Sequence, residues 1–283
     1  MKSVEIICPL YMAECYIENL HNSFLKQKKV NIQNIHYILT ECNDATEEHL
    51  KRLKCSYSKI SKKDFSHSLV REKAAFNSNS DIIVFVTQDV VIEKTNWLYE
   101  LVKDIDDEIV ATYSRQLPKC NGIEKYTREK NYPSSSSIVS KKDLTRLGLR
   151  TFFFSDASSA IKRDVFVSLN GYDNKNLPIS EDMYIAYKII MAGYKIKYCA
   201  SSEVVHSHNF TLKEIYNRYK LTGKFFKENN YLDKYGTTSA GGGLAKYILK
   251  RAIQELNIKV LLRYPFDMAA RLHGMKVGKK YGK

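Results

Sequence analysis

The sequence lacks any long hydrophobic run and any clustered cysteines. No stretch of about 18 uncharged apolar residues occurs, so we expect no membrane span. The N-terminus passes directly into a strand pattern without a basic region and a long apolar segment, so we expect no signal peptide. The six cysteines show no Cys-x-x-Cys spacing. They indicate reduced thiols in a cytoplasmic protein, and neither a disulfide framework nor a zinc site.

Recognisable nucleic-acid-binding motifs are also missing, although the chain is strongly basic. The formal net charge is +14, which favours nucleic acid, anionic lipid or phosphorylated substrates as partners. No basic run interleaved with aromatic residues dominates the chain, so we expect no nucleic-acid partner. The excess is heaviest from Lys246 onward, where ten lysines and arginines are opposed only by Glu255 and Asp267.

Tyrosine, by contrast, is abundant, with 20 copies beside a single tryptophan. Its flat face and hydroxyl suit stacking on sugars or bases, but most tyrosines in a chain fill core edges and surfaces. The 283 residues, 44% of them hydrophobic, are enough for one large α/β domain with or without an appendage.

Segments with strand character alternate with segments of helical periodicity along most of the chain. We predict strands at 4–9, 35–40, 57–60, 81–87, 109–113, 152–161 and 194–199, and helices at 13–27, 46–53, 66–77, 96–105, 163–169, 181–192 and 212–228. This alternation predicts a mostly parallel sheet with helices on both faces. Residues 116–149 are expected to form a long, partly mobile loop region with short helices. The glycine-rich residues 236–243 are expected to form a flexible joint before a basic helical end.

Ligands of such sheets bind beyond the carboxyl ends of the strands. The residues at three of these ends include Pro9 and Tyr11, Glu41 and Asp44, and Gln88 and Asp89. Asp89 suits a divalent cation that bridges two phosphates and neutralises a departing diphosphate, although a turn or cap role is the alternative. A second carboxylate two residues earlier would strengthen the metal interpretation, but that position is Thr87.

Two further residues of the first half have two interpretations each. Asp44 is either a helix N-cap or an acceptor for the imide N–H of a uracil or thymine ring. Arg71, which follows His67 near a predicted helix start, can clamp a phosphate, while a solvated helix charge is the alternative.

The second half carries two adjacent acids and two histidines. Glu181 and Asp182 open a predicted helix, where the helix dipole favours acids in any case. Inverting sugar transfer needs a carboxylate to accept the proton of the acceptor hydroxyl, so we assign Asp182 as the base and Glu181 as a supporting acceptor contact. His206 and His208 share one face of a strand. One imidazole could ligate the metal or bond the diphosphate, and a structural role is the alternative.

Taken in order, these stretches resemble the family 2 inverting glycosyltransferases of GT-A fold, and within them the bacterial rhamnosyltransferases. The resemblance covers the chain from Val4 to about Phe226. Its motifs are Thr40-Glu41-Cys42-Asn43-Asp44-Ala45-Thr46, Phe65-x-His67-x-x-x-Arg71, Thr87-Gln88-Asp89, Ser114-Arg115-Gln116-Leu117-Pro118, Asn131-Tyr132-Pro133, Ser159-Ala160-Ile161-Lys162-Arg163-Asp164, Gly171-Tyr172-Asp173, Glu181-Asp182, Ala192-Gly193-Tyr194 and His206-Ser207-His208.

The resemblance implies a dTDP-L-rhamnose donor, Mg²⁺ or Mn²⁺ at Asp89, and Asp182 as the base. His206 is taken as a further metal ligand. The nucleotide-sugar site is predicted to hold Pro9, Tyr11, Glu41, Asp44, His67, Arg71, Gln88 and Asp89, and the acceptor or diphosphate site Arg115, Asp156, His206 and His208. Ser68, Val70, Glu72 and Asp156 depart from the family pattern, and this bears on sugar specificity more than on the reaction.

The organisation implied is a GT-A catalytic domain over residues 1–228, with a nucleotide-sugar half (1–115) and an acceptor half (116–228), followed by a basic helical extension (229–283). The acceptor would be a lipid-linked or growing bacterial surface polysaccharide. Since such an acceptor lies at the anionic cytoplasmic leaflet, the basic extension predicts a peripheral contact with the inner face of the cell membrane. Packing on a partner subunit in a homo-oligomer is the alternative. Two alternatives remain for the function of the whole chain. It could carry out the same reaction with a UDP-hexose donor, or it could be an inactive protein that binds sugar nucleotides.

Overall fold

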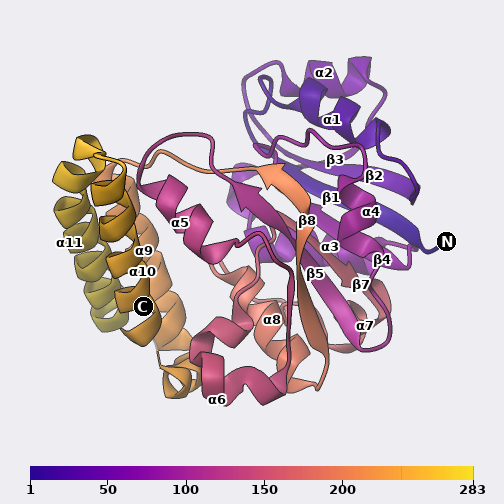
Figure 1. Ribbon diagram of the computed structural model, residues 1–283. Helices are drawn as coiled ribbons and strands as arrows, with labels where there is room; N and C mark the ends of the chain where they lie inside the picture. Colours follow the sequence, from indigo (N-terminus) through magenta and orange to yellow (C-terminus); the bar gives the residue numbers. More distant parts are fainter. Residues whose placement is uncertain (237, 283) are drawn as a thin grey trace.

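The structure is a computed structural model that describes residues 1–236 and 238–282, and only the backbone at 238–241. One sheet of eight strands runs in the order β3-β2-β1-β4-β7-β5-β8-β6 and lies between helices (Figure 1). The strands are β1 (Ser3–Leu10), β2 (Asn31–Thr40), β3 (Ser56–Ile60), β4 (Ile82–Val86), β5 (Ile109–Leu117), β6 (Ser137–Val139), β7 (Ser158–Lys162) and β8 (Lys195–Val205). The α-helices are α1 (Ile17–Leu25), α2 (Thr46–Arg52), α3 (His67–Asn77), α4 (Trp97–Val102), α5 (Ile123–Asn131), α6 (Leu144–Leu147), α7 (Arg163–Ser168), α8 (Glu181–Met191), α9 (Leu212–Glu228), α10 (Thr238–Gln254) and α11 (Ile258–Tyr281).

Four neighbouring strands form a parallel half of the sheet. β1 pairs in parallel with β2 and β4, and β2 pairs in parallel with β3. β4 is buried along its whole length, as expected for a strand that is covered on both faces. Because these strands are parallel, the residues that follow Leu10, Thr40 and Val86 meet at one edge of the sheet.

The other half mixes strand directions. β7 runs antiparallel between β4 and β5, while β5 pairs in parallel with β8. After a register shift between Ser114 and Arg115, the end of β5 stays paired with β8 as far as Val205. The backbone N–H of His206 then donates to Leu117 O at 2.8 Å, which brings the histidine segment to the same edge as the ends of β1 and β4. The predicted α/β fold with a mostly parallel central sheet is confirmed.

Each face of the sheet has its own hydrophobic core. On one face, α1 and α4 bring Phe24 and Trp97 together in a stacked pair with ring centroids 6.0 Å apart. On the other face, Phe85 from β4 meets Phe166 from α7 edge to face at 5.9 Å. These two cores hold the strand ends rigidly, so the polar residues beyond them have fixed positions.

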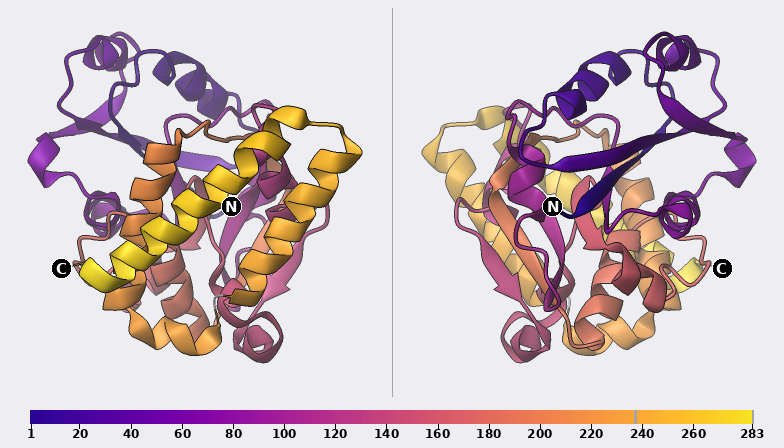
Figure 2. Two further views of the ribbon diagram at one scale, coloured as in Figure 1. Left: turned by 90° about the vertical axis from the view of Figure 1, so that its left-hand side faces the viewer. Right: turned by 90° about the vertical axis from the view of Figure 1, so that its right-hand side faces the viewer.

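The C-terminal helices form a third layer at one side of the molecule (Figures 1 and 2). α11, yellow in Figure 2, packs along α9 at glycines. A Cβ atom at Gly274 would collide with the carbonyl oxygen of Tyr216, and one at Gly278 with that of Lys220. The absence of side chains therefore allows the two backbones to approach closely. α10 and α11 also share a small core with Ile123 and neighbouring residues of α5.

Some of the sequence predictions were wrong in detail. Gly242 and Gly243, expected in a flexible joint, lie inside α10, because tertiary packing overrides the low helix propensity of glycine. Residue 237 of that predicted joint lies outside the described residues. The strand predicted at 152–161 begins only at Ser158, after a short 3-10 helix (Gly148–Phe152). The region 116–149 contains α5, β6 and α6, and no helix of the described chain is long and apolar enough to cross a bilayer.

Candidate active site

A cavity of about 1000 Å³ lies at the carboxyl edge of the sheet. Its walls come from the ends of β1 and β4, the first turns of α3 and α8, the segment after β8, and helices α5, α9 and α11. The structure brings most of the predicted site residues to this cavity: Pro9, Tyr11, His67, Arg71, Gln88, Asp89, Asp156, Glu181, Asp182, His206 and His208.

Gln88 supports the loop after β1 and fixes Tyr11 at the cavity wall. Its amide nitrogen donates to Tyr11 O at 2.9 Å, and its amide oxygen accepts from the backbone N–H of Tyr11 at 2.7 Å. The two strand ends are therefore clamped together. The Tyr11 ring stays available for stacking, with the Lys62 ammonium 5.1 Å from its centroid.

Asp89, His206 and His208 form a cluster suited to a cation. Asp89 Oδ2 lies 3.4 Å from His206 Nε2 and 3.7 Å from His208 Nδ1. One ligand atom from each residue lies within 4.8 Å of the others. Burial alone would raise the pKa of Asp89, but its bond to His206 and the nearby His208 and Lys119 outweigh burial and hold that pKa well below its ordinary value. Asp89 is therefore an anion at neutral pH.

The hydrogen bonds behind His206 determine which of its nitrogens faces Asp89. Gln116 donates from Nε2 to Ser155 Oγ at 2.8 Å, and its Oε1 lies 3.0 Å from His206 Nδ1. With this amide orientation, His206 carries a proton on Nδ1 and directs Nε2 at Asp89. A neutral imidazole would then place a lone pair against a carboxylate, so the contact requires a shared proton or a cation between them. The residues fit a divalent cation, and two imidazoles with one carboxylate suit Mn²⁺ better than Mg²⁺.

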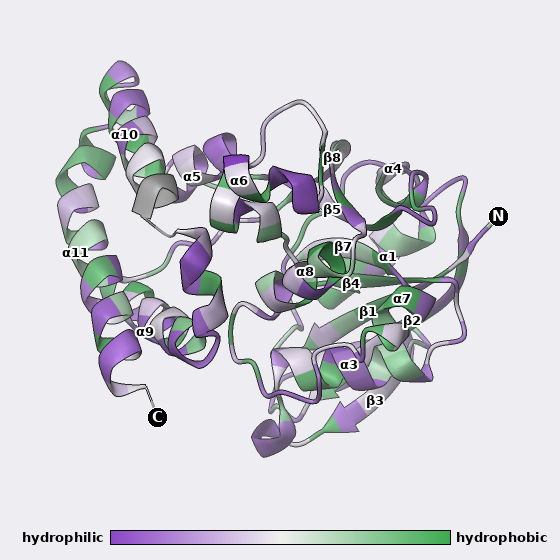
Figure 3. Cartoon of the chain, turned by 90° about the horizontal axis from the view of Figure 1, so that it is seen from below, coloured by the Kyte–Doolittle hydropathy of each residue, from purple (hydrophilic) through white to green (hydrophobic). Residues whose placement is uncertain are grey.

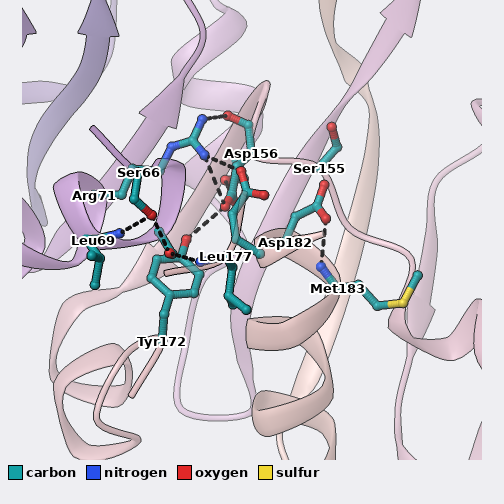
Figure 4. A network of polar contacts seen from close by, with 12 residues as sticks. Ser66, Leu69, Arg71, Ser155, Asp156, Tyr172, Leu177, Asp182 and Met183 are labelled. Atoms are coloured by element: carbon teal, nitrogen blue, oxygen red, sulfur yellow. Dashed lines mark hydrogen bonds and ion pairs between the residues drawn. The ribbon is translucent and has the colours of Figure 1, made fainter. Parts of the chain in front are cut away.

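A buried ion pair anchors the first turn of α8. Arg71 Nη1 donates to Glu181 Oε1 at 2.6 Å. The same nitrogen lies 4.0 Å from Asp156 Oδ2 (Figure 4). Asp156 also accepts from Tyr172 Oη and Ser159 Oγ, both at 2.8 Å. Arg71, with only 1% exposure, is therefore engaged by carboxylates of the protein, although the sequence suggested a phosphate clamp or a solvated charge.

Asp182, beside this pair, has the surroundings of a proton acceptor. Its Oδ1 accepts from the backbone N–H of Met183 at 2.7 Å (Figure 4). Burial raises the pKa of Asp182 well above its ordinary value, and the charges of Glu181 and Asp156 raise it further. A carboxylate with a raised pKa is a stronger base than an ordinary aspartate, which suits general-base chemistry.

The loop before α8 holds this turn in a strained conformation. Ser180 has φ 63° at the N-cap, in the left-handed region that costs most side chains energy. Upstream, the Glu72 carboxylate accepts from the backbone N–H groups of Tyr172 and Asn174. At Gly171, with φ +46°, a Cβ would collide with the Glu72 side chain. Glu72, which departs from the family pattern, thus holds the backbone of this loop through hydrogen bonds.

The structure does not bring Glu41, Asp44 or Arg115 to the cavity wall. Asp44 accepts from Thr46 Oγ1 at 2.8 Å and from the backbone N–H of Thr46 at 3.3 Å, while Ala45 is the N-cap residue of α2. Arg115 forms a 3.1 Å ion pair with Glu203 and so joins β5 to β8. The ligand contacts assigned to these three residues stay predictions.

His67 and Asp156 both line the cavity and are largely buried. Burial and the charge of Arg71 lower the pKa of His67 to about 4, so this imidazole is neutral. Asp156 is 2% exposed, and its carboxylate lies beside Arg71. The acceptor or diphosphate contact assigned to it stays a prediction.

The sequence interpretation missed the part of the wall that helices α5, α9 and α11 provide. Arg128 of α5, Arg218 of α9 and Arg271 of α11 all line the cavity. The Arg218 guanidinium stacks over Phe210, 4.7 Å from its centroid, and Phe210 stacks on His208. The basic residues of 246–283 predicted a membrane contact, but no pattern in the sequence placed Arg271 at the cavity.

Comparisons with known proteins find a family and individual proteins that this chain resembles. The model of the family described as Glycosyl transferase family 2 matches residues 5–169. The O-antigen chain rhamnosyltransferase RfbN of Salmonella typhimurium is 31% identical over 289 residues, which cover 98% of this chain and 90% of that protein. The O-antigen chain rhamnosyltransferase WbaN of Salmonella anatum is 34% identical over 232 residues, covering 78% and 72%.

The chain is also similar in fold to solved structures of proteins that are bound to nucleotide sugars. The mannosyltransferase PcManGT from Pyrobaculum calidifontis, in complex with GDP-Man and Mn²⁺, matches with a TM-score of 0.64 and 16% identity, covering 99% of this chain and 87% of that one. S. aureus TarS in complex with UDP-GlcNAc matches with a TM-score of 0.55 and 16% identity, covering 95% and 79%. At this identity the likenesses show the fold alone, and the predicted GT-A fold is confirmed.

Proposed function

Because the chain belongs to glycosyl transferase family 2 and is a glycosyltransferase, we propose that it transfers a rhamnosyl residue from dTDP-L-rhamnose with inversion. The acceptor is a saccharide hydroxyl on a lipid-linked or growing bacterial cell-surface polysaccharide. The names of the two Salmonella relatives, at 31% and 34% identity, support the sugar and the class of acceptor.

One observation carries the proposal. A single cavity holds Asp182, a buried carboxylate with a raised pKa, together with the cation-type cluster Asp89, His206 and His208. Sugar transfer from a nucleoside diphosphate needs both parts, since a proton must leave the acceptor while negative charge develops on the diphosphate.

In the proposed reaction, the acceptor oxygen forms a bond to C1 of rhamnose as the bond from C1 to the β-phosphate oxygen breaks. Asp182 takes the proton of the acceptor hydroxyl, and the electron pair of the broken bond leaves with dTDP. The reaction passes through an oxocarbenium-like transition state by analogy with glycoside hydrolysis. Glu181, held at 2.6 Å by Arg71, keeps the first turn of α8 in place and orients the acceptor.

Asp89, His206 and His208 would hold Mn²⁺ or Mg²⁺, which would supply charge neutralisation for the diphosphate. Arg218 lines the same cavity and has no ion-pair partner within the described part of the chain. Its guanidinium is stacked on Phe210, beside His208, so it is pre-positioned for a phosphate oxygen. We propose Arg218 as a second phosphate contact.

A thermal-shift panel of nucleotide sugars with and without Mn²⁺ tests the proposed donor, because a ligand that binds the native state raises its melting temperature. We expect stabilisation by dTDP-L-rhamnose in the presence of Mn²⁺ and little by UDP- or GDP-sugars. The opposite ranking would favour a UDP-hexose donor. Binding of dTDP-L-rhamnose without hydrolysis or transfer to a lipid-linked saccharide extract would favour an inactive binding protein.

A further inference from the structure

The turn between α10 and α11 exposes large apolar side chains in a group. Leu256 is 82% exposed, Leu262 69%, Ile258 66% and Phe266 64%. With two further exposed residues they form the α10–α11 apolar surface, which comprises Ile253, Leu256, Ile258, Leu262, Phe266 and Leu272. Figure 3 shows green, hydrophobic segments along these helices at the outer edge of the molecule. Such a concentration on one pair of helices indicates a surface that contacts something apolar.

Leu256 occupies a backbone position that favours glycine. Its φ is 51°, in the left-handed region where helices commonly end with glycine or asparagine. The side chain is also the most exposed of the apolar surface. Neither local conformation nor the core explains a leucine at this point. A partner that buries the side chain does explain it.

The apolar residues of α11 form a continuous stripe. Ile258, Leu262 and Phe266 recur every four residues, so they lie on one face of the helix. Val260 and Tyr264, on the opposite face, are buried against α5 and α10. The exposed stripe is therefore separate from the face that packs within the protein.

Lysines without partners flank the stripe. Lys246, Lys250, Lys259 and Lys276 are exposed, and no ion pair within the described residues includes any of them. The only acids after Lys246 are engaged elsewhere: Glu255 pairs with Lys125 and Arg251, and Asp267 is buried against Arg271. The apolar surface thus carries an uncompensated positive charge.

Two hydrogen bonds connect the start of α11 and the turn before it to the edge of the sheet at which the cavity lies. Asn257 donates to Asn121 O at 3.1 Å, just before α5, and Arg263 donates to the carbonyl oxygen of Phe210. Phe210 stacks on His208 with ring centroids 4.7 Å apart. The apolar surface therefore adjoins the end of the molecule at which the cavity lies.

We propose that the α10–α11 apolar surface docks on an anionic lipid bilayer, with Leu256 and the stripe of α11 among the acyl chains and the flanking lysines at the headgroups. An apolar stripe beside unpaired lysines matches the two components of an anionic bilayer. A second copy of the chain fits less well, because a two-fold interface would bring the lysine groups of both copies together. The inference rests on the proposed function for the lipid-linked acceptor, and it names the surface that brings the enzyme to that acceptor.

Co-flotation of the whole protein with vesicles tests the surface without any substrate. Wild type should float with vesicles of phosphatidylcholine and phosphatidylglycerol, and only weakly with phosphatidylcholine alone. Leu256→Ser with Leu262→Ser should lower the fraction bound at least tenfold, even at low salt. Lys250→Glu with Lys259→Glu should lower binding at low salt. Leu25→Ser, at a leucine that is 63% exposed on α1, is the matched control and should bind like wild type.

Melting temperatures and turnover of a soluble saccharide acceptor should be unchanged in these variants, so loss of docking is distinguishable from loss of the transfer reaction. Equal vesicle binding by wild type and the double leucine variant would overturn the proposal. So would absence of binding by wild type. A dimer in light scattering that the double leucine variant dissociates would assign the surface to a second copy, and this would also overturn it.

Discussion

Arg71 Nη1 and Glu181 Oε1 lie 2.6 Å apart inside the protein, although 110 residues separate them in the sequence. The contact joins the N-terminal parts of α3 and α8, and residues of both parts line the cavity. The guanidinium therefore links the predicted donor half of the site to the half that carries the proposed base. Because both side chains are mostly or entirely buried, the pair has consequences for stability and for catalysis.

Replacing Arg71 should leave two carboxylates without a cation. Breaking a buried pair from one side costs about 3–5 kcal/mol, so Arg71→Met should lower the free energy of unfolding by about that amount. Adding Glu181→Gln should recover part of the loss, because one buried charge is then removed. Urea unfolding measures both. Arg52→Met, which breaks an exposed pair with Glu18, is the control and should remain close to wild type. Unchanged stability in Arg71→Met would contradict the role of the pair.

Asp182→Asn should remove the proposed base and leave the fold intact. We expect kcat to fall by about 10²–10⁴, the usual range for a general base, while the Kd for the donor changes little. Transfer assays and donor titration measure the two effects. A variant that retains full turnover would remove Asp182 from the mechanism.

The same substitution should change the dependence of stability on pH. A raised pKa means that the folded state binds the Asp182 proton more tightly than the unfolded state does, so the contribution of this group is present at low pH and is lost as pH rises through the folded pKa. Asp182→Asn should therefore become more stable than wild type as pH rises above the ordinary value of 3.8. Asp164, which accepts from the next backbone N–H at 2.6 Å but is exposed, provides the matched Asp→Asn control and should show no such gain. Parallel melting curves for Asp182→Asn and wild type at every pH would contradict the assigned pKa direction.

Asp89→Asn and His206→Gln should each abolish the Mn²⁺-dependent part of the thermal shift with dTDP. We also expect Mn²⁺ to half-saturate the protein at a lower concentration than Mg²⁺, since imidazole nitrogen suits Mn²⁺ better. His273→Gln, at an exposed histidine stacked on Tyr216, is the control. Equal responses to the metal in Asp89→Asn and wild type would place the cation elsewhere.

Gly278→Ala should force α11 away from α9, because the added Cβ would collide with the carbonyl oxygen of Lys220. Overpacking of this kind costs about 1–3 kcal/mol. Gly243→Ala, inside α10 with open space around it, should instead stabilise by about 0.5–1 kcal/mol through the higher helix propensity of alanine. Thermal unfolding of the two variants measures the contrast. A neutral Gly278→Ala would show that the helices do not depend on close contact there.

The sequence allowed prediction of the strand ends and of much that follows them. Asp89 follows a strand whose hydrophobic character is clear, and parallel strands bring their carboxyl ends together. The strand before His206 was predicted to end at residue 199, but β8 continues to Val205, so His206 and His208 follow this strand and do not lie within it. The acids of α8 were identified by their position at a helix start. The ion pair of Glu181 with Arg71 was not predicted, because a contact between segments 110 residues apart leaves no local pattern.

The remaining wall of the site depends on tertiary packing. Arg271 lines the cavity because α11 packs on α9 through Gly274 and Gly278. From the sequence alone, a glycine within a helix predicts a less stable helix, and it does not indicate that a second helix approaches closely there. Asp156 was assigned an acceptor or diphosphate contact from the sequence, and its position beside the buried Arg71 guanidinium could not be predicted there. The family pattern therefore identified residues that the fold brings to one cavity, but not the contacts that they make within the protein.

The most direct test of the proposed reaction is the NMR spectrum of the product formed from dTDP-L-rhamnose, Mn²⁺ and a lipid-linked saccharide extract. The proposed reaction predicts a new rhamnosyl linkage whose anomeric configuration is opposite to that of the donor. Wild type should form this linkage, and Asp182→Asn should not. A product with retained configuration, or sugar transfer from UDP- or GDP-hexoses but not from dTDP-L-rhamnose, would contradict it.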